Sequence, residues 1–159
     1  FDGGVVTFEK ALRMGTVAVH SSIMYRKCAR KTVNPNFNAM DLFYTWEVLS
    51  FGSGMILDDI LGEYRVNSSN AITTSSRHYL KLLNAHHANY FFRVHPDRRR
   101  DIFVFALTNF LVDLKNRRKS AIKFFFLALR AFSLVSPKEF IAHLREVIKL
   151  GKPKLGLKR

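Results

Sequence analysis

The spacing of hydrophobic and polar positions changes along the 159-residue chain. Residues 16–27 alternate small or apolar side chains with polar ones and are rich in β-branched residues, a pattern that predicts a strand. Residues 55–59 and 61–66 also have the composition of short strands, whereas residues 8–14 and 41–52 carry apolar side chains at helical spacing. The first part of the chain therefore predicts a mixture of strands and helices.

The rest of the chain predicts helices alone. Four segments carry apolar or aromatic side chains at helical spacing or over most of their length. We expect them to form helices over residues 77–92, 98–114, 118–134 and 137–149. A polar stretch, residues 67–76, has the composition of a linker. The pattern divides the chain into a mixed segment, residues 1–75, and a helical segment, residues 76–159.

None of the apolar segments is long enough to predict a membrane-spanning helix. A span needs about 18 or more consecutive apolar residues. Residues 102–112 form a shorter run, and residues 121–135 are interrupted by Lys123 and Arg130. We therefore expect no helix that crosses a bilayer.

Composition narrows the class of protein. Hydrophobic residues make up 48% of the chain, enough for a buried core and too many for a globally disordered protein. Cys28 is the only cysteine, which excludes an intramolecular disulfide and a cysteine-rich zinc site and agrees with a reducing compartment. The chain begins at Phe1 without a basic or apolar leader. We therefore expect a cytoplasmic protein without a signal peptide, and we treat the sequence as part of a longer chain.

The charge is distributed as unevenly as the secondary-structure pattern. Residues 1–75 contain seven Lys/Arg and seven Asp/Glu, whereas residues 76–159 contain 19 basic and 5 acidic residues. The helical segment therefore carries the whole net charge of +14. Such a difference indicates two segments with different surroundings.

Three short blocks of sequence, in this order, carry a resemblance to a known family. They are VHSSIMYRK (residues 19–27), FNAMDLFYTWEVLSFGSG (37–54) and ILDDILGEYRVNSSNAIT (56–73). The first resembles a family strand that contains two serines, an aromatic residue and an arginine. The second resembles a helix opened by a Glu-Asp pair, and the third resembles a closing Tyr-Arg-Val-His stretch. Together the blocks resemble the C-terminal half of a family-2 glycosyltransferase of the GT-A fold.

The resemblance implies both a fold and an activity. The fold would be α/β, a partial GT-A domain made of the acceptor half with few short strands, followed by an all-helical C-terminal segment. The intact enzyme would transfer a sugar from a nucleotide sugar to an acceptor hydroxyl, with inversion. The family's nucleotide-binding half, with its Asp-x-Asp motif for a divalent metal (Mn²⁺ or Mg²⁺), has no counterpart in this sequence. The chain alone would therefore be inactive.

Asp41 is the candidate catalytic residue. In the family the second acid of the Glu-Asp pair is the usual catalytic base, and Asp41 matches it, although Met40 stands where the family has Glu. A base would take the proton from the acceptor hydroxyl as that oxygen attacks the anomeric carbon, and a helix N-terminus favours the ionised carboxylate. The alternative is that Asp41 only begins a helix, because acidic residues are common in a first helical turn.

The resemblance also implies a set of substrate-binding residues. His20, Ser21 and Ser22 would line the acceptor or donor cleft at a strand end, or would be an ordinary pair of strand-end hydroxyls beside a histidine. Tyr64 and Arg65 would approach the donor diphosphate, because a guanidinium group matches phosphate oxygens.

Other interpretations of these positions stay open. Arg65 could instead pair with Asp58, Asp59 or Glu63 at the surface. Asn67, which replaces the family's histidine, weakens the expectation of a metal or phosphate contact there.

Trp46 and the His86–His87 pair could suggest binding sites, but their positions favour structural roles. Trp46 lies on the apolar stripe of its expected helix, so we expect it in the core rather than as a sugar platform. His86 and His87 are adjacent on an expected helix, where neighbouring side chains point about 100° apart. They are therefore unsuited to sharing one metal ion, and we expect ordinary helix histidines.

The basic helical segment has three interpretations. Basic clusters at residues 98–100, 115–119 and 149–159 lie beside phenylalanine-rich segments, an arrangement that suits an anionic membrane surface. A basic helical patch is also the electrostatic footprint of a nucleic-acid-binding protein, but no known nucleic-acid-binding motif is present. The third interpretation is a solvated basic face on a packed helical bundle.

The resemblance implies a nucleotide-sugar-dependent glycosyltransferase. Its acceptor would be a glycan or lipid-linked molecule of cell-surface polysaccharide assembly, and it would lie in the cytoplasm or peripherally on the inner face of the cell membrane. The alternative is a non-enzymatic basic helical module that binds nucleic acid or a protein partner.

Overall fold

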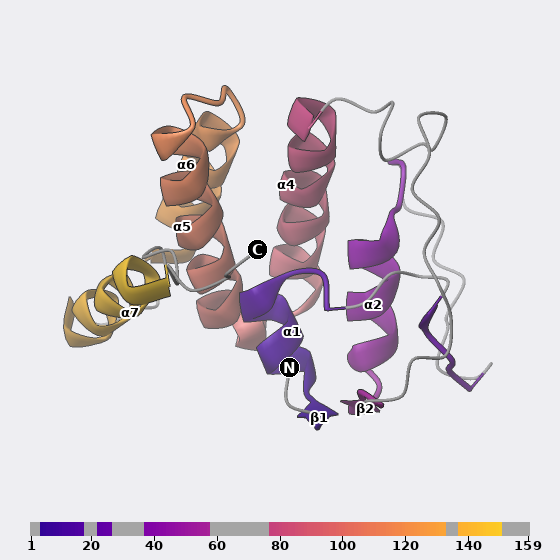
Figure 1. The fold of residues 1–159 in the computed structure, drawn as a ribbon. Coiled ribbons are helices and arrows are strands. Elements are labelled where there is room, and N and C mark those ends of the chain that lie inside the picture. Colours follow the sequence, from indigo (N-terminus) through magenta and orange to yellow (C-terminus); the bar gives the residue numbers. More distant parts are fainter. Residues whose placement is uncertain (1–3, 18–21, 27–36, 58–76, 133–136, 151–159) are drawn as a thin grey trace, which may run out of the picture.

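The computed structural model describes residues 4–17, 22–26, 37–57, 77–132 and 137–150, and Figure 1 shows how they are arranged. The helices and strands are listed here in chain order: β1 (Val5–Val6), α1 (Phe8–Met14), α2 (Asp41–Leu49), β2 (Gly54–Met55), α4 (Arg77–Val94), the 3₁₀ helix η3 (Pro96–Arg98), α5 (Arg99–Lys115), α6 (Ala121–Phe132) and α7 (Pro137–Leu150).

The predicted α/β fold is wrong, because the structure is mostly helical and contains no GT-A sheet in the described residues. The sheet described consists of β1 and β2, which pair antiparallel with Val5 opposite Met55. The described part of the predicted strand 16–27 forms no strand. Of residues 55–57 only Met55 belongs to a strand, although the Ile56 N–H donates to the Gly4 carbonyl. Residues 58–59 and 61–66 lie outside the described residues. β-branched composition favours a strand only where neighbouring strands can pair with it, and here the apolar surface is buried between helices.

The helices follow from local sequence signals. Thr7 caps α1, since its hydroxyl accepts a 3.2 Å hydrogen bond from the backbone N–H of Lys10, and an N-cap hydroxyl satisfies one of the free amides of the first turn. The helix ends at Gly15, whose φ of 88° lies in the left-handed region. The prediction of a helix over residues 8–14 is confirmed.

The four helices predicted for the second segment are also confirmed, with bounds shifted by a few residues. Pro96 opens η3 and thereby separates α4 from α5, since a proline cannot donate the hydrogen bond that would continue a helix. The helix predicted from residue 41 begins at Asp41, as expected, but ends at Leu49 instead of residue 52.

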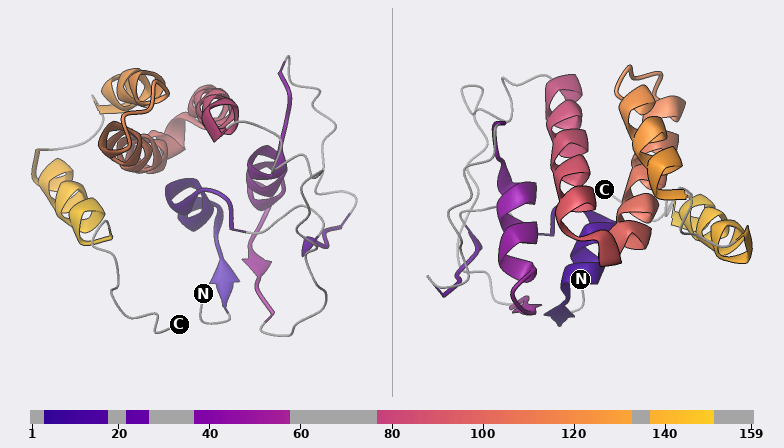
Figure 2. Two further views of the ribbon diagram at one scale, coloured as in Figure 1. Left: turned by 45° about the horizontal axis from the view of Figure 1, so that its top comes forward. Right: turned by 180° about the vertical axis from the view of Figure 1, so that it is seen from behind.

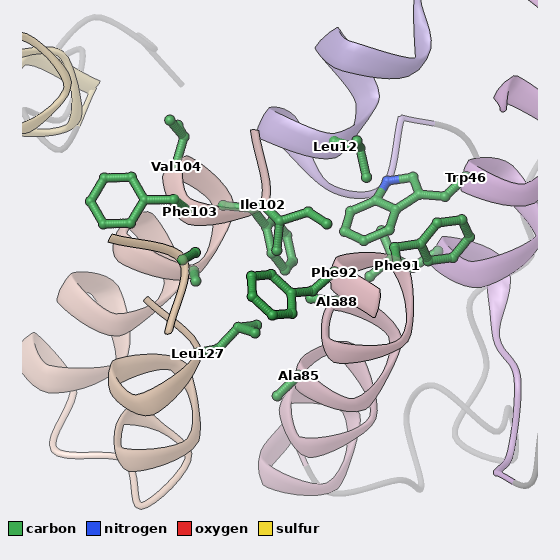
Figure 3. Packing of buried hydrophobic residues seen from close by; sticks show 14 of the residues in the cluster. Leu12, Trp46, Ala85, Ala88, Phe91, Phe92, Ile102, Phe103, Val104 and Leu127 are labelled. Carbon is green, nitrogen blue, oxygen red and sulfur yellow. The ribbon is translucent and has the colours of Figure 1, made fainter. Parts of the chain in front are cut away.

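One hydrophobic core joins helices from both segments of the sequence. Trp46 is fully buried, and its ring makes edge-on contacts with Phe91 of α4 and Phe105 of α5, with ring centroids 5.3 and 5.1 Å apart. Leu12 of α1 lies beside it (Figure 3). α5 lies between α1 and α6, and α4 lies alongside them (Figure 2). The expected core position of Trp46 is confirmed.

Candidate functional site

Asp41 occupies the first position of α2 and is partly exposed. The N-cap residue, Met40, has an extended backbone and offers no side-chain hydrogen bond to the first turn. The free amides of that turn carry the positive end of the helix dipole, which stabilises a nearby anion. Among the described residues, no hydrogen bond or ion pair involves the Asp41 carboxylate. The geometry thus leaves an ionisable carboxylate at an uncapped helix start.

The chain just before Asp41 is anchored to α4. The side-chain amide of Asn38 donates a 3.1 Å hydrogen bond to the hydroxyl of Tyr79, and the backbone carbonyl of Asn38 lies 3.2 Å from Nε2 of His87. Both partners come from α4, about 40 to 50 residues away in the sequence. These contacts fix the approach of the chain to α2 and therefore the position of Asp41.

Aromatic rings support the same junction from beneath. Phe37 lies 5.6 Å from Phe43, 5.4 Å from His87 and 5.9 Å from Tyr90, measured between ring centroids. Phe43 is buried and also contacts Tyr90 at 5.2 Å. Rings at these distances pack in the tilted and edge-on arrangements that aromatic pairs prefer. Residues on both sides of Asp41 therefore pack against α4.

His87 acts in this junction as a neutral anchor. Its side chain is fully buried, and burial lowers its pKa, an effect that the hydrogen bond to Asn38 opposes. Because a carbonyl only accepts, Nε2 must carry the proton and donate it. Nδ1 is buried and has no hydrogen-bond partner in the described structure, so a second proton there would have no acceptor. His86, by contrast, is exposed, so the two adjacent histidines lie in different surroundings.

Of the predicted substrate-binding set, only Ser22 lies within the described residues. Ser22 is exposed. His20, Ser21, Tyr64 and Arg65 lie outside the described residues, as do the linker at residues 67–76 and Asn67.

The sequence pattern did not predict that Asn38, Tyr79 and His87 anchor the start of α2. Asn38 precedes the helix start by three residues, which marks it as a loop position. Its hydrogen bonds to α4 join residues far apart in the sequence, and neighbouring residues do not predict such contacts.

A second polar cluster is buried between α4, α5 and the start of α6. The Asp113 side chain is fully buried. It accepts hydrogen bonds from Ser120 Oγ at 2.8 Å and from Arg118 Nη1 at 3.1 Å, and Lys81 Nζ lies 4.0 Å away. Lys81 also donates to Asn109 at 2.5 Å, and burial lowers the pKa of Lys81 while Asp113 opposes that change. These groups satisfy one another, so the cluster holds helices together.

Two kinds of site are not seen in the described residues. No three His, Cys, Asp or Glu side chains gather there as metal ligands. None of the described helices combines the length and hydropathy needed to cross a membrane. The family resemblance implies a divalent metal held mainly by the nucleotide-binding half, so the described residues do not test that expectation.

Comparison of the chain with protein-family models, with curated proteins and with solved structures finds no significant match.

Proposed function

We propose that this chain supplies the acceptor-activating carboxylate of a nucleotide-sugar-dependent glycosyltransferase, with Asp41 as the general base. The observation that carries the proposal is the position of Asp41, a partly exposed carboxylate at the uncapped start of α2. The resemblance of residues 19–27, 37–54 and 56–73 to family-2 glycosyltransferases supports it. The proposal does not rest on a GT-A sheet, which the described residues lack.

The proposed chemistry needs one proton acceptor. Asp41 takes the proton of an acceptor hydroxyl while that oxygen forms a bond to the anomeric carbon of the donor sugar. The bond from the anomeric carbon to the nucleoside diphosphate breaks, and its electron pair leaves with the phosphate oxygen. Attack from the face opposite the leaving group inverts the configuration. A divalent metal, when bound, would stabilise the charge of the departing diphosphate.

The anchors on α4 give Asp41 the fixed position that this step requires. A general base must lie within hydrogen-bond reach of the proton that it removes, and small displacements of a catalytic group reduce rates steeply. The hydrogen bonds of Asn38 to Tyr79 and His87 set that position. The acceptor is a glycan or lipid-linked hydroxyl of the kind used in cell-surface polysaccharide assembly.

The proposal is tested with the protein expressed from its complete reading frame. Release of nucleoside diphosphate from nucleotide sugars, with Mn²⁺ present, is measured for the wild type, Asp41→Asn and Asp97→Asn. Asp97 is a matched control because it also lies in the first turn of a helix, η3, and is exposed. Asp41→Asn should lower turnover by about 10²- to 10⁴-fold with nucleotide binding retained, and Asp97→Asn should leave it unchanged.

Wild-type turnover by Asp41→Asn would return Asp41 to the role of a helix start. If neither the wild type nor a variant binds or turns over a nucleotide sugar, the glycosyltransferase proposal fails. The alternative, a basic helical module that binds nucleic acid or a protein partner, is then favoured.

A further inference from the structure

The helix α6 carries two apolar faces, and only one of them is buried. The buried face packs against α4 and α5 and consists of Ala121, Phe124, Leu127, Ala128 and Ala131. On the opposite side, Ile122, Phe126 and Leu129 are 61%, 58% and 51% exposed. Their spacing of four and three residues places them on one stripe of the helix. A helix that only packed into a bundle would be polar on its outer side.

Neighbouring aromatic side chains extend this outer stripe. Phe125 and Phe132 are partly exposed at its edge. Phe125 also contacts Phe110 of α5 at 5.4 Å, and Phe132 contacts Phe140 of α7 at 5.3 Å. The stripe is therefore anchored to the rest of the protein. α6 lies at the edge of the helical assembly, with α5 between it and α1 (Figure 2).

Cationic side chains border the exposed stripe. Lys123 and Arg130 are seven residues apart and both exposed, so they lie on the same flank of α6. Arg130 is held in place because its guanidinium lies 5.2 Å from the centre of the Phe92 ring and donates to Asn89 at 2.9 Å. Lys119, two residues before the helix, is exposed as well.

The sequence around α6 contains cations where a helix alone would favour acids. Between Asp113 and Glu139 there are seven Lys/Arg and no Asp/Glu. The first turn of α6 contains no acidic residue, although the helix dipole favours acids at that end. Arg118 and Arg130 are engaged within the protein, by Asp113 and Asn89, whereas Lys119 and Lys123 are exposed.

We propose that α6 is an interfacial helix that docks the protein onto an anionic lipid surface. Ile122, Phe126 and Leu129 enter the boundary between headgroups and acyl chains. Lys119 and Lys123 lie at the level of the lipid phosphates. An apolar face bordered by Lys and Arg is the signature of helices that lie in the membrane interface, and long basic side chains can reach the headgroups while their stems stay in apolar contact.

Charge favours a lipid surface over a second copy of the chain as the occupant. Apposing two α6 helices antiparallel along this stripe would bring Lys123 of each copy toward Arg130 of the other, and each copy carries a net charge of +14. Like charges placed face to face destabilise an interface. An anionic surface instead attracts these residues.

The test is binding of the purified chain to vesicles of phosphatidylcholine alone and of phosphatidylcholine mixed with phosphatidylglycerol. The stripe variant Ile122→Ser/Phe126→Ser/Leu129→Ser is compared with Met14→Ser/Phe51→Ser/Leu57→Ser. The control replaces three apolar side chains of similar exposure, 53%, 48% and 51%, that lie outside α6. A charge variant, Lys119→Gln/Lys123→Gln, is compared with Arg26→Gln/Arg93→Gln, whose residues are also exposed. Fluorescence of the single, fully buried Trp46 reports whether each variant is folded.

The proposal expects binding to anionic vesicles that weakens with added salt. The stripe variant should bind at least about tenfold more weakly, and the charge variant should lose about fivefold for each cation removed. Both controls should bind like the wild type. Because vesicle binding needs neither Asp41 nor a nucleotide, its outcome is independent of the proposed glycosyl transfer.

Three outcomes would overturn it. The first is equal loss of binding in the stripe variant and its matched control. The second is dimerisation of the wild type, without vesicle binding, that the stripe variant abolishes; this would assign the stripe to a second copy. The third is absence of vesicle binding together with salt-dependent binding of duplex DNA or RNA that only the charge variant weakens; this would assign the surface to nucleic acid.

Discussion

The indole N–H of Trp46 in α2 donates a 3.0 Å hydrogen bond to the backbone carbonyl of Ala11 in α1. The bond is buried, and the same indole ring contacts Phe91 and Phe105. One side chain therefore connects the helix that begins at Asp41 with three other helices. This connection explains how the candidate base is held by the core although it lies at the surface.

Trp46→Phe should lower the free energy of unfolding by about 1–3 kcal/mol, because it removes a buried hydrogen bond and part of a large buried ring. The loss has an upper limit, since the Ala11 carbonyl also accepts a 2.8 Å hydrogen bond from the Gly15 N–H. Urea unfolding followed by circular dichroism measures the change. Phe126→Leu, at an exposed position, is the control and should be close to neutral. Equal midpoints for the two variants would show that Trp46 is not a central contact.

Gly15 should resist substitution while Gly52 tolerates it. Gly15 has a φ of +88°, and an added Cβ would lie 3.0 Å from the Phe105 ring. Gly15→Ala should therefore cost about 1–3 kcal/mol of stability. An added Cβ at Gly52 meets no atom within 4 Å, so Gly52→Ala should be neutral or stabilise by up to about 1 kcal/mol. Thermal unfolding of the two variants side by side measures the difference. An equal loss of stability at Gly52 and Gly15 would contradict the prediction that only Gly15 is constrained by its backbone and by Phe105.

Asp113 should contribute more to stability than any exposed aspartate. Asp113→Ala leaves the cations of Lys81 and Arg118 without their buried partner and Ser120 without its acceptor. Because both cations are partly exposed, we expect a loss of about 2–4 kcal/mol, at or below the usual cost of breaking a buried pair. Asp97→Ala, which removes an exposed pair with Arg98, should cost less than about 1 kcal/mol. Denaturant midpoints of the two variants measure this difference. Similar midpoints would mean that the buried cluster around Asp113 does not stabilise the fold more than an exposed ion pair does.

His87 should make stability depend on pH near neutrality. Burial lowers the pKa of His87 below its ordinary value of 6.5, so the unfolded chain binds this proton more readily than the folded one. Stability is then complete above pH 6.5 and falls as the pH drops from that value toward the lower folded pKa. His95 contributes in the same direction, since burial lowers its pKa too.

His87→Gln should flatten this dependence, because a glutamine side chain does not titrate. The measurement is the urea midpoint from about pH 8 to about pH 5.5, where histidines titrate and carboxylates mostly do not. His86→Gln is the matched control, since His86 is exposed. A slope that is the same in His87→Gln and in the wild type would assign the pH dependence to other groups.

The sequence predicted the helices better than the strands, for a physical reason. Helical periodicity and caps are local, so α1 and the four helices after residue 76 appear within a few residues of their predicted bounds. Strands need partners, and the alternation in residues 16–27 does not reveal whether any partner exists.

The candidate site was predicted only at its centre. The helix start at Asp41 follows from neighbouring residues. The contact of Asn38 with Tyr79 and the ion pair of Arg13 with Asp101, 88 residues apart, arise from packing and have no local signature. Residues outside the described ranges, such as Arg65, stay predictions.

Chemical rescue of Asp41→Ala is the most direct test of Asp41 as a base. Turnover of a nucleotide sugar by the protein from its complete reading frame is measured with increasing formate, a small carboxylate that can occupy the vacated space. The account predicts that Asp41→Ala loses about 10²- to 10⁴-fold in turnover and regains part of it as formate rises, whereas Asp41→Asn, whose amide fills the space, does not recover. Wild-type turnover by Asp41→Ala, or the same response to formate in the wild type and both variants, would contradict the account.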